Sequence, residues 1–219
     1  MVTPGKLRQS LAEALALQDH LERIDVHLRN LREAGLIAKA KRGRGAAEMG
    51  PTDAAHLLLA VAGSELVKDS VRTVEQYGEL RADPASVSVR GNYERGRYRL
   101  ALLDLPPKHT VVEALSQIFS LLASNVFFAD VRYELERRYG SRPSEQAEYI
   151  FLRLFRPYQA ASIHYGVRRR LDVQVVYGSL PIRDPRVAWD LRNLETAGQL
   201  LTVRVVDQAA LSKIAHVVG

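Results

Sequence analysis

Apolar residues recur at helical spacing near the start of the chain and predict a mainly helical N-terminal part. The first two predicted helices cover residues 3–17 and 20–34. The second packs through one narrow apolar stripe, formed by Leu21, Ile24, Leu28 and Leu31. Asp19 and Glu22 have the spacing of a capping box at its start, and Gly35 is placed to end it.

A short strand, a basic loop and a returning strand are predicted next. Leu36 and Ile37 form the first strand, and Met49 belongs to the second. Between them the sequence alternates cations with glycines, and such a loop cannot bury itself. A third helix opens at Thr52 and supplies several core leucines.

A fourth predicted helix, over residues 64–80, completes the N-terminal unit. Residues 81–85 follow it, and the proline that they contain interrupts the helical pattern. We therefore expect two domains, residues 1–80 and residues 86–219.

The second unit mixes strands and helices in no repeating order. Alternating polar and apolar residues predict strands within residues 86–105, 163–175 and 200–206, the middle segment being two strands or one bulged strand. Helices are predicted over residues 110–122, 125–139, 143–155 and 184–194 and from Asp207 onward. The expected fold class is α+β, with a mainly helical winged helix-turn-helix unit followed by a mixed α+β unit.

Composition narrows the class of partner. The 219-residue chain has a net charge of +6 and a pI near 9.7, which favours a polyanion. Cysteine is absent, which excludes disulfides and thiolate zinc sites and indicates a reducing compartment. The apolar runs are too short to span a bilayer, and no signal-peptide core opens the chain. We expect a cytoplasmic, nucleoid-associated protein without membrane contact.

The polar face of the helix at residues 20–34 carries side chains that can read DNA bases. Arginine can bind guanine, asparagine can bind adenine, and a valine methyl can touch thymine. The candidate base-contacting residues are Arg23, Val26, His27, Arg29 and Asn30. The basic loop can follow a phosphate backbone. Its candidate phosphate contacts are Lys39, Lys41, Arg42 and Arg44. Each feature alone also fits a solvated helix or a basic linker, but their order favours DNA binding.

In this order the pieces resemble a winged helix-turn-helix. Residues 42–49 and 52–60 are similar to the wing and following helix of transcription activators from alphaproteobacterial prophages and gene transfer agents. The resemblance covers about the first third of the chain. It implies that the helix at residues 20–34 enters the major groove while residues 39–44 hold the backbone or the minor groove. Classical members place another helix before this pair, so the Thr52 helix or a second subunit is expected to cover that face.

We therefore expect sequence-specific binding of double-stranded DNA by a transcription regulator, an activator of phage-like or gene transfer agent genes. A homodimer is expected, and the C-terminal unit would dimerise or contact RNA polymerase or another transcription factor. Two alternatives stay open. A small terminase-like packaging protein would carry the same module on a ring, and a non-enzymatic interaction protein would bind an acidic partner through the basic loop.

The sequence carries no recognisable motif for catalysis, cofactor binding or metal binding. Neither GxxxxGK[ST] nor HExxH occurs, and the six histidines lack metal-ligand spacing. Each histidine is therefore expected to be a core or surface residue rather than a ligand. A second basic cluster, residues 168–170, is expected to lie in a turn between strands. We expect no enzymatic activity, cofactor or metal.

Overall fold

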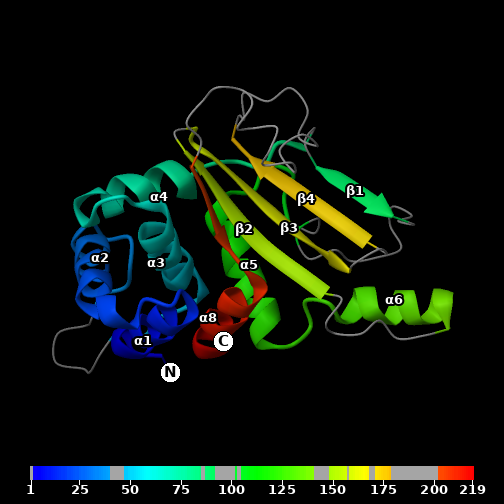
Figure 1. Cartoon of the computed structure of the whole chain (residues 1–219), viewed down its shortest axis with the longest axis horizontal. Coiled ribbons are helices and arrows are strands. Elements are labelled where there is room, and N and C mark those ends of the chain that lie inside the picture. The colour runs from blue at the N-terminus through cyan, green and yellow to red at the C-terminus, as the bar shows by residue number, and fades with distance from the viewer. Residues whose placement is uncertain are drawn as a thin grey trace.

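The computed structural model describes residues 2–39, 47–84, 87–91, 102, 105–140, 148–156, 158–167, 171–178 and 202–219. Within these residues, helices from both ends of the chain cover one face of an antiparallel sheet, with the N-terminal helices gathered on one side of it (Figure 1). The fold is mixed α+β, as the sequence predicted.

The N-terminal part consists of short helices joined by tight turns. They are α1 (Pro4–Ala14), α2 (Leu21–Glu33), α3 (Pro51–Gly63) and α4 (Ser70–Gly78), with 3₁₀ turns η1 (Gln18–His20) and η2 (Val67–Asp69). Thr3 caps α1, and Gly35 follows α2 with a left-handed φ of 78°, both as expected. The expected capping box of Asp19 and Glu22 is wrong, because η1 precedes α2 and no side chain caps that helix. The helix expected over residues 64–80 is replaced by η2 and the shorter α4.

The residues on either side of the basic loop are not strands. The backbone N–H of Leu36 donates to the Leu31 carbonyl, and that of Ala38 donates to the Asp53 carboxylate at 3.0 Å. On the other side, the N–H of Met49 donates to the Val2 carbonyl at 2.9 Å. The expected strands at residues 36–37 and 49 are therefore wrong, because these backbone groups have other partners. The wing itself is not confirmed, since residues 40–46 lie outside the described part of the chain.

Five described strands form one sheet in which every neighbouring pair is antiparallel. They are β1 (Ser88–Gly91), β2 (Glu148–Arg156), β3 (Ala160–Val167), β4 (Leu171–Tyr177) and β5 (Thr202–Val206), in the order β1-β4-β3-β2-β5. Two separate strands, rather than one bulged strand, account for residues 163–175. The strand expected at residues 200–206 is confirmed by β5.

Strand β2 corrects the helix that was expected over residues 143–155. Ile150, Leu152 and Leu154 are buried on one face, while Tyr149 and Phe151 are half-buried on the other. This alternation has the period of a strand, and aromatic and branched residues favour a pleated surface. Pairing with β3 on one side and β5 on the other satisfies the backbone of β2. Long-range pairing therefore outweighed the helical pattern over residues 148–155, while residues 143–147 lie outside the described part of the chain.

Three helices belong to the described C-terminal part; two begin where capping residues predicted, and the helix expected from residue 125 begins later, at Ala129. They are α5 (Val111–Ala123), α6 (Ala129–Tyr139) and α8 (Gln208–Val218). Thr110 and Glu113 form the expected capping box of α5, and Asp207 caps α8. The helix expected over residues 184–194 lies outside the described residues. So do residues 98–101 of the second strand arm, while Leu102 lies in a turn.

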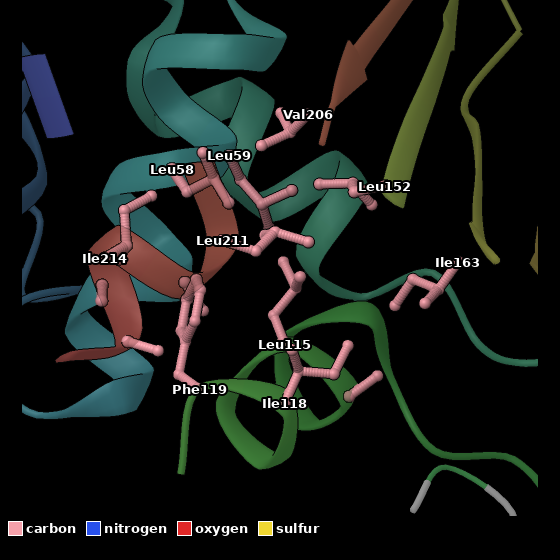
Figure 2. Packing of buried hydrophobic residues seen from close by; sticks show 14 of the residues in the cluster. Leu58, Leu59, Leu115, Ile118, Phe119, Leu152, Ile163, Val206, Leu211 and Ile214 are labelled. Atoms are coloured by element: carbon pink, nitrogen blue, oxygen red, sulfur yellow. The ribbon is translucent and has the colours of Figure 1, made fainter. Parts of the chain in front are cut away.

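One buried cluster joins the two units that the sequence analysis separated. Figure 2 shows its centre, where side chains of α3, α5 and α8 meet the helix-facing side of β2, β3 and β5. The labelled residues are Leu58, Leu59, Leu115, Ile118, Phe119, Leu152, Ile163, Val206, Leu211 and Ile214. The C-terminal α8 also packs against α1, and Ser10 donates a hydrogen bond to the Lys213 carbonyl at 3.1 Å. Residues from both expected domains therefore share a core.

Among the helices that the structure describes, none combines the length and the apolar character needed to cross a bilayer.

Candidate nucleic-acid interface

Helix α2 was the predicted reading helix, and it presents only part of its polar face. It packs against α1, α3 and α4. Arg23 and Arg29 are exposed, and Val26 is half-buried. Lys39, the first cation after the helix, is also exposed. The other candidate phosphate contacts, Lys41, Arg42 and Arg44, lie outside the described residues.

Two of the candidate base-contacting residues face the protein instead of solvent. His27 is buried, and its Nδ1 shares a hydrogen bond of 2.8 Å with the Ser70 hydroxyl. The amide of Asn30 donates to the Val67 carbonyl at 2.8 Å. These contacts attach α2 to η2 and α4. A helical wheel of α2 does not show that these two elements cover this side of the helix. We therefore correct the expected contact set by leaving out His27 and Asn30.

The surroundings of His27 keep its imidazole neutral. Burial, and to a smaller extent the positive charge of Arg23, lowers the pKa of His27 from 6.5 to about 4. Within the described residues its Nε2 has no hydrogen-bond partner. A proton added there would place an uncompensated charge between α2 and α4.

This pKa predicts a loss of stability in acid. Because the folded pKa lies below the unfolded value, the contribution of His27 is fully present above about pH 6.5 and is lost as the pH falls towards 4, by roughly 3 kcal/mol at the low end. Urea unfolding of the wild type and of His27→Gln across this range measures the effect. The variant should have the shallower pH dependence, and parallel curves for the two proteins would contradict the assignment.

Three arginines from distant parts of the chain lie near Glu65, in the turn after α3. Sequence patterns did not connect them. Arg23 donates to the Glu65 carbonyl at 2.9 Å, and the guanidinium of Arg156 is 2.8 Å from its carboxylate. The charges of both arginines also reach Arg204 on β5. No sequence signal joins residues 23, 156 and 204, because only the pairing of β2 with β5 and the packing of α2 bring them together.

The opposite face of the sheet holds a polar cluster. The Asp172 carboxylate accepts a hydrogen bond from the Tyr149 hydroxyl and is hydrogen-bonded to Nε2 of His164, whose ring lies 4.6 Å from that of Phe151. Burial, and then the contact with Asp172, raises the pKa of Tyr149, so its phenol stays protonated. No group of three or more metal-ligating side chains occurs in the described part of the chain. The cluster links adjacent strands and gives no evidence of a reaction.

A small cavity of about 110 Å³ lies between α5, α6, α8 and the start of β2. Its polar lining residues are Asn125, Arg132, Glu148, Gln208, Ser212 and His216. Sites for drug-sized ligands and cofactors occupy about 300–1,000 Å³, so this space suits a few water molecules and not a nucleotide.

In comparisons with known proteins, no protein-family model, curated protein or solved structure matches the chain. Function is therefore inferred from its residues and their geometry.

Proposed function

We propose that this chain binds double-stranded DNA in a sequence-specific manner and regulates transcription. In this proposal α2 docks in the major groove, with Arg29 and Val26 towards the bases. Lys39 and the cations that follow it, Lys41, Arg42 and Arg44, contact phosphates. The observation that carries the proposal is the exposed Arg29 on the outer face of α2, with exposed Lys39 opening the basic segment soon afterwards.

The dimensions and charge of this region suit a duplex. A helix of 13 residues such as α2 is about 20 Å long, and the major groove accepts a single α-helix. The net charge of +6 favours a polyanionic partner. Four cations within residues 39–44 would release counterions from the phosphates that they contact.

The finer parts of the proposal concern regulation. We propose a homodimer, because groove-binding helices of dimeric regulators read half-sites about one helical turn apart. The targets would be phage-like or gene transfer agent genes, activated through contact of the C-terminal part with RNA polymerase or another transcription factor. Such a protein would be associated with the nucleoid.

Two sets of substitutions should separate base reading from phosphate binding. Arg42→Ala combined with Arg44→Ala should weaken binding to every duplex about equally, and should lower the salt slope of log K by about 0.9 for each lost contact. Arg29→Ala should instead change sequence preference by about 1–3 kcal/mol. The measurement is fluorescence anisotropy on a selected duplex and on an unrelated duplex over a range of salt concentrations.

The exposed Lys108, which lies before α5, supplies a matched control through Lys108→Ala, and this variant should bind like the wild type. A wild-type protein without salt-dependent duplex binding would overturn the proposed function. Unchanged sequence preference in Arg29→Ala would overturn the role of α2 alone.

A further inference from the structure

Glu65 holds two arginines that come from distant parts of the chain. Its carbonyl accepts a hydrogen bond of 2.9 Å from Arg23 on α2, while its carboxylate lies 2.8 Å from the guanidinium of Arg156 at the end of β2. The Glu65 side chain is 74% exposed and that of Arg156 is 18% exposed. The glutamate thus lies on the solvent side of the arginine that it pairs with.

Arg204 adds a third guanidinium on the same side of the sheet. It is opposite Leu154 in the pairing of β5 with β2, so it is a diagonal neighbour of Arg156 on the helix-facing side. Arg204 is half-buried, and it makes no hydrogen bond or ion pair with the described residues. Burial, and then the positive charges of Arg156 and Arg23, lowers the pKa of Arg204. Glu65 and Tyr77 oppose this shift, but they compensate the charge of Arg204 only in part.

The chemistry of this cluster suits a phosphate group. Arg156 pairs with the Glu65 carboxylate, whereas Arg23 contacts only the Glu65 carbonyl. The nearby charge of Arg204 therefore leaves an excess of positive charge in a partly desolvated position. Guanidinium groups bind phosphate oxygens through paired N–H donors and lose less hydration than ammonium groups do. Because Glu65 is exposed, its carboxylate can move aside when an anion arrives. A bound phosphate would relieve the repulsion that Arg204 experiences.

We propose that Arg23, Arg156 and Arg204 form a phosphate-binding site that holds the DNA backbone beside the N-terminal half of α2. The inference rests on the proposed function and deepens it. Arg23 then contacts a phosphate and not a base, which revises its expected role. The basic segment that follows α2 contacts the backbone from the other end of the helix, so a groove-bound α2 is held at both ends.

The test compares Arg204→Gln with the wild type in duplex binding over a range of salt concentrations. The variant should bind every duplex about 5–10-fold more weakly at low salt, with a salt slope smaller by about 0.9, the effect of one lost phosphate contact. Arg204→Lys keeps the charge and should retain most of the salt slope while binding more weakly than the wild type. Lys6→Gln removes an exposed cation from α1. It should change the affinity and the salt slope much less than Arg204→Gln does.

Inorganic phosphate provides a second readout that needs no DNA. At constant ionic strength it should raise the Tm of the wild type more than that of Arg204→Gln, and equal rises would overturn the site. Wild-type affinity and salt slope in Arg204→Gln would also overturn the site, while leaving the proposed function standing. If the wild type binds no duplex, the proposed function is overturned. The proposed role of the site in binding the DNA backbone is then overturned as well.

Discussion

Replacing Phe119 by alanine is expected to lower the free energy of unfolding by about 3–5 kcal/mol and to leave one cooperative transition. Phe119 is fully buried on α5, where α3 and α8 meet it (Figure 2). Truncation removes most of its apolar surface from the core and leaves a cavity that helices on all sides cannot fully close. Because the same cluster contains residues of the N-terminal helices and of the sheet, both parts should lose stability together.

Denaturant unfolding followed by amide hydrogen exchange tests this expectation. Protection of α3 and of α8 should fall by the same amount of free energy, because both depend on the shared core. Val126→Ala is a suitable control, since Val126 is 47% exposed and its truncation should change stability by less than about 0.5 kcal/mol. If α3 keeps its protection while the sheet and α8 lose theirs, the two units are independent and the sequence-based domain boundary is right.

Much of the secondary structure was predictable because its signals are local. Thr110 and Glu113 mark the start of α5 within four residues, and Asp207 marks the start of α8. Left-handed Gly35 marks the end of α2 in the same way. The alternation in β4 could also be recognised, since Leu171, Val173 and Val175 recur at every second position. These features need no knowledge of what the segment packs against.

The errors arise where distant segments decide the outcome. Residues 148–156 contain apolar positions that fit a helix as well as a strand, and the pairing of β2 between β3 and β5 selects the strand. An apolar run of two residues, such as residues 36–37, is too short to define a strand unless a pairing strand is known. The core shared by both ends of the chain was also not predictable, because α8 reaches α1 from the opposite end of the sequence.

In the candidate site, too, features set by local sequence were predictable and features set by distant segments were not. The exposure of Arg29 was predictable from its position off the apolar stripe of α2, and that of Lys39 from its place in a basic loop. The burial of His27 was not, because it depends on η2 and α4 covering a second side of α2. The approach of Arg156 and Arg204 to α2 depends on sheet register, which single-sequence patterns leave undefined.

Replacing Glu148 by glutamine is expected to lower the free energy of unfolding by about 3 kcal/mol. Arg132 on α6 makes a two-point contact with this carboxylate, one arm of which measures 2.6 Å. The Glu148 side chain is 2% exposed and that of Arg132 is 20% exposed, so their contact is largely shielded from bulk solvent. The neutral amide keeps the shape of the carboxylate and removes its charge, which weakens the charge-assisted contact with the guanidinium beside the small cavity.

A double variant separates the charge effect from packing. Arg132→Met with Glu148→Leu removes both charges and fills similar volume, so it should be within about 1 kcal/mol of the wild type or more stable, because a buried ion pair gains little over apolar packing. Denaturant unfolding of the single variants Arg132→Met and Glu148→Leu and of the double variant measures the coupling free energy. If the double variant is as unstable as Glu148→Gln, packing and not charge explains the loss. If both single variants match the wild type, the ion pair contributes little to the stability of the fold.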